Sequence, residues 1–416
     1  MAALKYWLWL TTAPGLSNRT KLLLLEHFSS PEDVYYAQPD ELCLVEGVTK
    51  QQAQVLADKS LTRAETVLAD CAKDGQFIVT MDDAAYPGRL RDMYDPPVVL
   101  YGKGSMPLFD EEAAVAVVGT RKCTPYGTGA ASQLGYELAR QGGLVVSGLA
   151  KGIDGAAHQG ALRAGGFTAA VLGGGVDPGS AGSIPSPPLF CSAVRRRLYE
   201  DIAATGVLLS EYPPGTEPKG SHFPVRNRII SGLSLGVLVV EAPERSGALI
   251  TANTALEQGR DVFAVPGPIN ADTSRGCNQL IRDGAGLVME AWDVLGTYQR
   301  QFPQKLRPIR AAMPETPKGA EDETRDTPVP AKQEGEKAPE RPVLDLAGEG
   351  AALTDDQKRV LRVLPADRPL LADEAAVMTE LPVRRVLSAL TMLEIDGYVC
   401  RQGAGSFLRT VELREE

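Results

Sequence analysis

The chain has 416 residues, of which 44% are hydrophobic and 23% charged, and its formal net charge is −10. These proportions are typical of soluble globular domains, and the length allows two or three of them. No apolar run reaches the roughly 20 residues that cross a bilayer, so we expect no membrane segment and a cytoplasmic protein. Six scattered cysteines and three histidines suggest neither a disulfide framework nor a zinc site, and we expect no cofactor.

The negative net charge argues against nucleic acid as a partner of the whole surface, because a negative field repels phosphate. The distribution of charge qualifies this argument. Acidic residues are in excess in about the first hundred residues and in the tail, whereas the segment from Glu111 to Arg300 is nearly balanced. The sequence is therefore compatible with a local basic surface.

Residues 1–75 show apolar positions at helical spacing and predict a small helical domain. Two similar turns, at 13–16 and 45–48, each lead into a helix with a polar start, the layout of a SAM-like or paired helix-hairpin-helix domain. Such hairpins can bind a DNA backbone through the amides at a helix N-terminus. A purely structural role explains the same pattern, and both interpretations stay open.

Residues 76–103 predict an edge hairpin and a connector, and the next two hundred residues alternate buried apolar runs with helical stretches. Continuous apolar strands with helical crossovers indicate a parallel sheet that is covered on both faces. We therefore predict an α/β, Rossmann-like, doubly wound and mostly parallel sheet over residues 76–300. The expected strands are 115–118, 144–146, 168–172, 207–209, 237–240, 262–265 and 286–288, with helices such as 126–141 and 154–164 between them.

Residues 301–350 are rich in Pro, Glu, Lys, Thr and Gly with almost no aromatic residue, which predicts a disordered linker. Residues 351–416 then show three short helices and a small hairpin, the pattern of a winged-helix domain. Its third helix carries Arg384 and Arg385 and could enter a DNA groove. Winged helices on tethers also bind proteins or only pack, so this domain has more than one interpretation.

In an open parallel sheet, ligands bind beyond the carboxyl ends of the strands. These ends are polar and rich in glycine here, and small residues let a ligand approach the backbone. Arg121, Arg226 and Arg228 add forked donors that suit phosphate. The residues expected to form the pocket are Gly119, Ser147, Gly148, Asp154, Gly173, Gly174, Ser246, Gly247 and Thr251.

The motifs that are missing indicate which kind of phosphate ligand to expect. The sequence lacks the P-loop pattern, and the glycines that follow the first long strand do not complete a dinucleotide fingerprint. Several arginines on different loops can instead follow a polyanion, while Phe223 or Tyr212 could stack on a base. Each arginine could also form only a surface ion pair.

Two carboxylates are candidates for catalysis, and each has a plainer interpretation. Asp154 and His158 lie four residues apart on one predicted helix and could form an acid–base pair, although Asp154 can equally cap the helix and order its loop. Glu241 ends a strand, where it could be a catalytic group or an ion-pair partner for Arg226 or Arg228.

Seven segments in this order resemble the DprA/Smf (DNA-processing protein A) family, and they cover most of residues 80–290. The helical front domain and the winged-helix end look like accessory domains of that family. The segments are 117–121 (VVGTR), 147–158 (SGLAKGIDGAAH), 223–233 (FPVRNRIISGL), 240–242 (VEA), 246–252 (SGALITA), 259–267 (GRDVFAVPG) and 276–285 (GCNQLIRDGA).

The resemblance implies single-stranded DNA binding by the Rossmann-like domain, a homodimer, loading of RecA recombinase during natural transformation, and no catalysis. It adds Lys151 and Asn227 to the expected DNA contacts Arg121, Phe223, Arg226 and Arg228. Leu280 and Ile281 would lie on the dimer surface, although a core role explains them equally well. The segment 177–191 is longer than in the family and lacks its Tyr-Pro turn.

Two other functions remain open from the sequence. Related Rossmann-like proteins hydrolyse nucleotide monophosphates, and Glu241 or Asp154 could serve such a reaction. A transcriptional regulator that acts through the winged helix would instead require a preference for particular duplex sequences.

Overall fold

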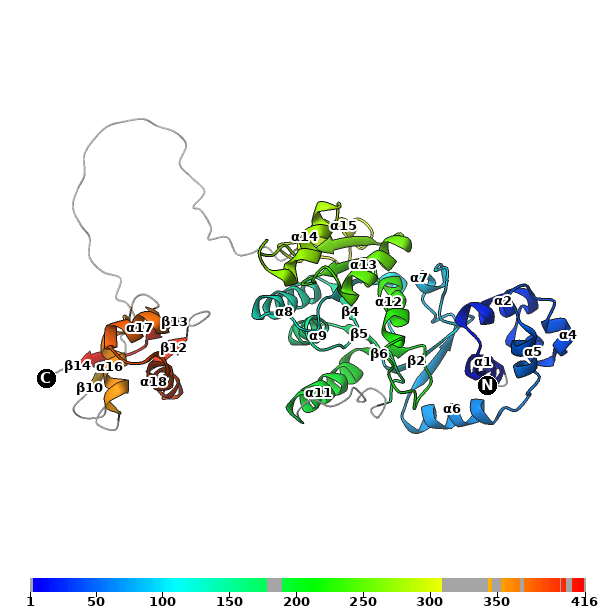
Figure 1. Ribbon diagram of the computed structural model, residues 1–416, viewed down its shortest axis with the longest axis horizontal. Coiled ribbons are helices and arrows are strands. Elements are labelled where there is room, and N and C mark those ends of the chain that lie inside the picture. The colour runs from blue at the N-terminus through cyan, green and yellow to red at the C-terminus, as the bar shows by residue number, and fades with distance from the viewer. Residues whose placement is uncertain are drawn as a thin grey trace, which may run out of the picture. The chain divides into compact units, whose positions relative to one another are not determined.

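The computed structural model of the chain describes residues 3–177, 189–308, 343–345, 353–366, 370–396, 398–401 and 406–414. The chain forms two compact units, Met1–Thr316 and Pro317–Glu416 (Figure 1). None of the helices in these ranges combines the length and the apolar character that crossing a bilayer requires. Most of the atypical segment 177–191 lies outside the described residues.

The first residues form the predicted helical region. Its helices are closed by ordinary local signals: the Ser17 hydroxyl accepts a hydrogen bond from the amide of Thr20, and Thr49 and Gln52 form a capping box. Gly15 and Gly47 have positive φ values of 74° and 89° in the two predicted turns, where a side chain would be strained. The helices are α1 (Leu4–Thr12), α2 (Asn18–Phe28), α3 (Pro31–Tyr36), α4 (Pro39–Leu42), α5 (Lys50–Leu56) and α6 (Thr62–Lys73).

The helical region does not have a core of its own. Its buried residues, such as Leu8 and Leu56, belong to one cluster with Val99 and Tyr101 of the sheet's antiparallel edge and with Leu208. The first 75 residues and the sheet are therefore packed as parts of one compact unit.

Among the described residues, the larger unit contains a nine-stranded sheet with the order β1-β2-β6-β5-β4-β3-β7-β8-β9. The strands from β3 onward pair in parallel, and β1 and β2 add an antiparallel edge through β6. The predicted α/β, mostly parallel fold is confirmed. The strands are β1 (Phe77–Thr80), β2 (Val99–Gly104), β3 (Ala113–Val118), β4 (Gly143–Ser147), β5 (Thr168–Val171), β6 (Val207–Ser210), β7 (Gly236–Val239), β8 (Asp261–Ala264) and β9 (Gly286–Leu287).

Helices cover both faces of this sheet (Figure 1). Alternate residues of β3 enter different cores: Ala116 packs with the helices on one face, and Val115 packs with those on the other. The first face carries α7 (Gly88–Arg91), α12 (His222–Leu233), α13 (Gly247–Glu257) and α14 (Arg275–Arg282), and the second carries α8 (Pro125–Arg140), α9 (Ile153–Arg163), α11 (Leu189–Thr205) and α15 (Trp292–Tyr298).

The predicted linker contains two described pieces that are packed. Phe302 and Leu306 are buried in the core beside α15, so the larger unit continues past residue 300. Val343–Asp345 forms β10, which pairs with β14 (Glu412–Arg414) in the smaller unit. The remaining linker residues lie outside the described ranges.

The smaller unit has the predicted winged-helix elements. Its three helices surround a core that includes Val360, Leu390 and Phe407. The elements are α16 (Asp355–Val363), β11 (Leu370–Leu371), α17 (Ala372–Thr379), α18 (Val383–Ile395), β12 (Val399–Arg401) and β13 (Ser406–Arg409).

Candidate functional site

The loops that follow β3, β4, β5 and β6 lie at one edge of the sheet, because these strands are neighbours and parallel. The order of the strands reverses between β3 and β7, which is where open α/β sheets bind ligands. Helix α12 starts beside these loops, and its first turn carries Phe223. The candidate site is therefore built from four loops and one helix.

Phe223 is the centre of this site. Its half-buried ring lies against the loop after β5, where a Cβ on Gly173 would come within 3.1 Å of the ring. The guanidinium of Arg121 lies 4.6 Å from the ring centroid and that of Arg226 lies 5.9 Å from it. Cations over an aromatic face are attracted by its negative potential.

The two arginines have different surroundings. Arg121 is exposed and forms no ion pair with any described residue. Arg226 is only 3% exposed, and it donates hydrogen bonds to the carbonyls of Gly148 and Val171. Burial lowers the pKa of Arg226 to about 10, while the nearby Asp154 opposes this shift. Both carbonyls accept from Nη1 of Arg226, and its Nε has no hydrogen-bond partner among the described residues, so its contact with phosphate stays a prediction.

Asp154 orders the loop after β4. Its buried carboxylate accepts hydrogen bonds from the amides of Gly148 (3.2 Å) and Ala150 (3.4 Å). Burial raises the pKa of Asp154, and the charge of Arg226 and the two amides counteract part of that rise. Of the predicted capping and loop ordering, the carboxylate performs the second: both amides precede α9, which has no side-chain cap hydrogen bond.

His158 does not form an acid–base pair with Asp154. Its fully buried ring shares a 2.7 Å hydrogen bond with the hydroxyl of Thr168 through Nδ1. Burial lowers the pKa of His158 to about 3, so the ring is neutral at physiological pH.

Arg228 is also occupied by the protein. It is 9% exposed, its Nη2 bonds the carboxylate of Glu211, and its Nε lies 3.2 Å from Oδ2 of Asp95. Burial raises the pKa of Glu211, an effect that Arg228 opposes. Arg228 therefore ties α12 to the loop after β6 and to the connector, and its expected phosphate contact also stays a prediction.

Glu241 pairs with neither Arg226 nor Arg228. Its carboxylate is 2% exposed and accepts a 2.9 Å hydrogen bond from the amide of Thr124, the N-cap of α8. A Cβ on Gly127 would lie 1.9 Å from Oε2 of Glu241, so only glycine leaves room for this contact. Of the two interpretations of Glu241, the ion pair is absent among the described residues, and Glu241 instead supplies negative charge to the start of a helix.

This role of Glu241 leads to a stability prediction. The Glu241→Ala variant should lose about 0.5–2 kcal/mol of unfolding free energy, the usual cost of removing a side-chain acceptor at a helix start. Urea unfolding measures this loss. Glu244→Ala, whose side chain is 68% exposed, is the control and should change stability by less than about 0.5 kcal/mol. Equal stabilities of the two variants would contradict the capping role.

Most of the remaining predicted pocket residues have structural contacts. The hydroxyl of Ser147 donates to the carbonyl of Val117 (2.6 Å), and Ser246 caps α13 by accepting from the amide of Ala248. Thr251 is 2% exposed. Three glycines allow close packing, since an added Cβ would lie 2.5 Å from the Ile153 side chain at Gly119, 2.5 Å from the Arg226 guanidinium at Gly148 and 2.8 Å from the Thr216 carbonyl at Gly174. Gly247 is exposed.

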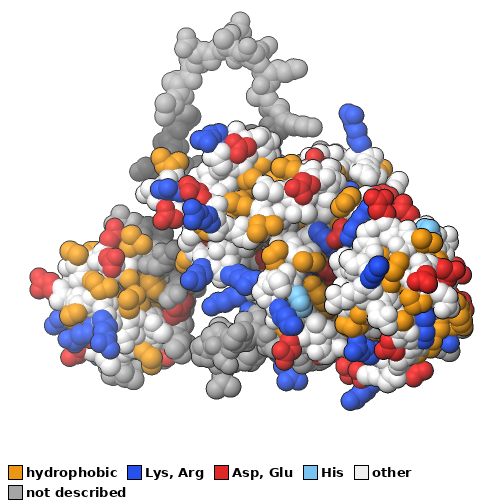
Figure 2. Space-filling view, turned by 45° about the vertical axis from the view of Figure 1, so that its right-hand side comes forward, with side chains coloured by type: hydrophobic (Ala, Val, Ile, Leu, Met, Phe, Trp, Pro, Cys, Tyr) orange, Lys and Arg blue, Asp and Glu red, His pale blue; other side chains and the backbone are white. Residues whose placement is uncertain are grey.

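Further exposed cations lie on the loops of the site. Lys151 follows β4 and was predicted. Lys122, next to the Thr120-Arg121 loop, and Lys219, before α12, were not predicted from the sequence. The face of the larger unit in Figure 2 shows Lys and Arg side chains close to one another, with hydrophobic side chains between them. Tyr212 stacks on His222 at 4.2 Å and 14°, rather than pointing alone to solvent.

The described residues contain no group of three His, Cys, Asp or Glu side chains that could hold a metal ion.

Asn227 is half-buried on α12. Leu280 and Ile281 are also half-buried and pack against the core of their own unit. The structure thus separates buried residues that shape the site from exposed ones that can reach a ligand.

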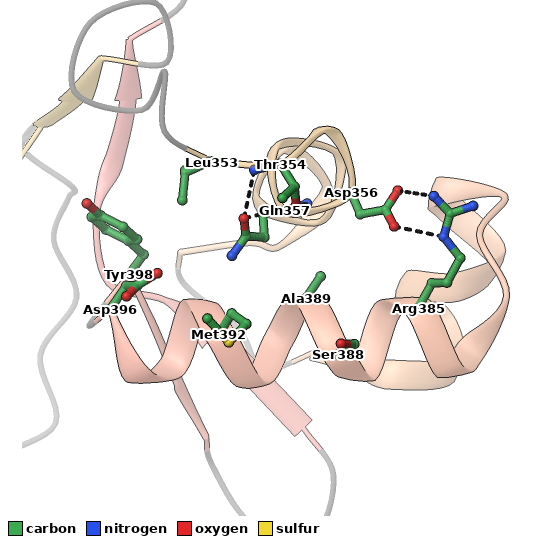
Figure 3. A pocket seen from close by; sticks show the side chains of 10 residues that line it. All are labelled: Leu353, Thr354, Asp356, Gln357, Arg385, Ser388, Ala389, Met392, Asp396 and Tyr398. Carbon is green, nitrogen blue, oxygen red and sulfur yellow. Dashed lines mark hydrogen bonds and ion pairs between the residues drawn. The ribbon is translucent and has the colours of Figure 1, made fainter.

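A separate cavity of about 650 Å³ lies in the smaller unit, between α16 and α18 (Figure 3). Arg385 faces Asp356 across it and makes two hydrogen bonds of 2.8 Å to that carboxylate, while Met392 and Tyr398 line its other end. Arg385 is therefore paired with an acidic residue of its own domain, although its side chain is 59% exposed. Arg384 is exposed.

Two family models match the chain: "DNA recombination-mediator protein A" over residues 77–299 and "DprA winged helix domain" over residues 345–405. The chain is 33% identical over 407 residues to Protein Smf of Synechocystis, covering 95% of this chain and 96% of that protein. It is 39% identical to the DNA processing protein DprA of Bacillus subtilis, covering 69% and 93%.

The fold is similar to that of a solved relative. The X-ray structure of DNA processing protein A from Streptococcus pneumoniae superimposes with a TM-score of 0.59 and 37% identity, covering 70% of this chain and 97% of that one. The range matched by the first family model, residues 77–299, includes the sheet and the loops that carry the candidate site.

Proposed function

Because the chain belongs to the DNA recombination-mediator protein A family, we propose that it binds single-stranded DNA at the strand-end site and delivers it to the RecA recombinase during natural transformation. In this proposal the chain binds DNA in the cytoplasm, where the recombinase works, and catalyses no reaction. The single observation that carries it is the exposed guanidinium of Arg121 above the half-buried ring of Phe223.

This pair of side chains suits a single strand better than a duplex. An aromatic face stacks on an unpaired base of any sequence, and a neighbouring cation contacts the phosphate beside it. Lys151, Lys122 and Lys219 add exposed charges on adjacent loops. Arg226 and Arg228 are buried and Asn227 is half-buried, and in this proposal the three residues fix the position of Phe223 on α12.

The alternative of a nucleotide hydrolase is less well supported. A hydrolase needs a carboxylate that can reach its substrate. Asp154 and Glu241 are buried, and both accept hydrogen bonds from backbone amides. We therefore retain the binding function.

Fluorescence anisotropy with labelled single-stranded and duplex DNA of matched sequence, over a series of salt concentrations, tests the proposal. The wild type should prefer single strands, tolerate any sequence and bind more weakly as salt rises. Arg121→Ala should weaken this binding several-fold and reduce the slope of log K against log salt by about 0.7, the value of one phosphate contact on a single strand.

Arg140→Ala is the control for this experiment, because Arg140 is exposed at the end of α8, near the opposite edge of the sheet. It should bind as the wild type does. Equal affinity and equal salt slope in Arg121→Ala and the wild type would contradict the site. Failure of the wild type to bind single strands would contradict the function.

A homodimer completes the proposal. Leu280 and Ile281 are largely used by their own core, so other side chains near α14 must carry much of the contact. Ile269 and Met289 are 90% and 80% exposed and lie before and after this helix in the chain. Analytical ultracentrifugation of Ile269→Asp against the wild type would measure the dimer, and an unchanged mass would contradict this surface.

A further inference from the structure

We infer that the single-strand site extends from Phe223 along α12 onto the helical region, where a second base stacks on Tyr94 and a phosphate contacts Arg19. This inference rests on the proposed function and extends the same surface. It assigns a DNA contact to the helical region, whose role the sequence left open.

Tyr94 and Arg19 form an exposed aromatic–cation pair outside the strand-end site. Tyr94 is 82% exposed, among the most exposed large hydrophobic side chains of the described residues. The guanidinium of Arg19, on α2, lies 4.9 Å from the centroid of its ring. The pair has the chemistry of Arg121 over Phe223, an arginine beside one face of an aromatic ring.

The backbone around this pair is fixed, which makes it a defined surface. The side-chain amide of Asn18, next to Arg19, donates 2.7 Å hydrogen bonds to Oδ1 of Asp95 and to the carbonyl of Pro96. Asp95, next to Tyr94, reaches Arg228 of α12 with its other oxygen. One chain of polar contacts thus connects α2, the connector and α12.

This series of polar contacts links the two aromatic–cation pairs through α12. Arg228 lies five positions after Phe223 on α12, a rise of about 7.5 Å. Val225 is 43% exposed and lies three positions before Arg228, on the same side of the helix. Val225 therefore adds an exposed apolar side chain on α12, between Phe223 and Arg228 in the sequence.

Exposed charges of both signs lie at this end: Arg19 is an exposed cation, and Asp92, two residues before Tyr94, is an exposed acid. Asp95 is engaged by Asn18 and Arg228, and Glu211 by Arg228. Arg19 forms no ion pair with any described residue and is exposed. Lys21, two residues further on α2, is occupied by contrast, since its ammonium donates to the carbonyl of Thr11.

Binding of oligothymidylates from about 4 to about 16 nucleotides, the range of a single-strand site, tests the extension. The shortest strands should bind Tyr94→Ala as they bind the wild type, because they fill only the Phe223 site. The longer strands should bind it roughly five-fold or more weakly, the effect of losing one base stack. Tyr94→Phe should restore the affinity, and Arg19→Ala should reduce the salt slope for long strands only.

Tyr36→Ala is the matched control, because Tyr36 is 63% exposed on the same helical region and belongs to a different aromatic group. It should bind all lengths as the wild type does. Equal gains in affinity with length for the wild type, Tyr94→Ala and Arg19→Ala would overturn the extension and leave the proposed function intact. Uniform weakening at every length together with a lower Tm would also overturn it, since the pair would then only hold α2 in place. A wild type that binds no strand would overturn the proposed function itself.

Discussion

The Arg226→Ala variant is expected to lose about 3–5 kcal/mol of unfolding free energy, the usual cost of removing one partner of a buried charge pair. Arg226 is 3% exposed and supplies hydrogen bonds to the carbonyls of Gly148 and Val171. Its removal leaves these acceptors and the nearby carboxylate of Asp154 without their cation. Urea unfolding at neutral pH measures the loss.

Two further variants make this result specific. Arg121→Ala should change stability by less than about 0.5 kcal/mol, because its side chain is exposed. In Arg226→Ala/Asp154→Ala both buried charges are gone, so the double variant should be destabilised by less than the sum of the single variants. If Arg226→Ala instead kept its stability and lost only DNA affinity and salt slope, Arg226 would be a phosphate contact after all.

The sheet could be predicted from the sequence because its signal is local. Each parallel strand is buried on both faces and therefore appears as a short apolar run, such as residues 113–118. The two turns with Gly15 and Gly47 were also visible as glycines between helical stretches. The order of the strands was not predicted, but the carboxyl ends of parallel strands share one edge, so the edge that carries the site was predicted.

The burial of Arg226 and Arg228 could not be predicted, because it depends on segments that are distant in the sequence. Arg226 and Arg228 look alike in the sequence, as two cations on one helix. The first is buried by carbonyls of the loops after β4 and β5, and the second by Asp95 and Glu211. A pattern that spans one helix contains no information on these partners.

The role of Glu241 was missed for a related reason. A carboxylate at a strand end near arginines suggests an ion pair, yet the nearest free donor is the amide of Thr124 at the start of α8. Gly127 offered a signal, since a glycine in the first turn of a helix leaves space for another side chain. The exposed Lys122 and Lys219 could have been found by listing every cation beside the strand ends.

His158 should make the protein sensitive to acid over a defined range of pH. Its pKa is about 3 in the folded protein and 6.5 as a model value, so the unfolded chain binds a proton first as the pH falls. The stability that the neutral ring contributes is therefore present above about pH 6.5 and is lost as the pH decreases toward 3. One pKa unit corresponds to about 1.4 kcal/mol, so the loss approaches at most about 5 kcal/mol.

Urea unfolding of the wild type and His158→Gln over this range isolates the effect, because the other titrating groups are common to both proteins. The glutamine cannot take up a proton, while its amide can still reach the hydroxyl of Thr168, the partner of the histidine ring. The difference between the two stabilities should change with a slope of up to about 1.4 kcal/mol per pH unit below pH 6.5 and should be constant above it. Parallel curves at every pH would mean that the ring is protonated equally in the folded and unfolded states. That result would contradict a neutral His158, and with it the argument that His158 is not an acid–base catalyst.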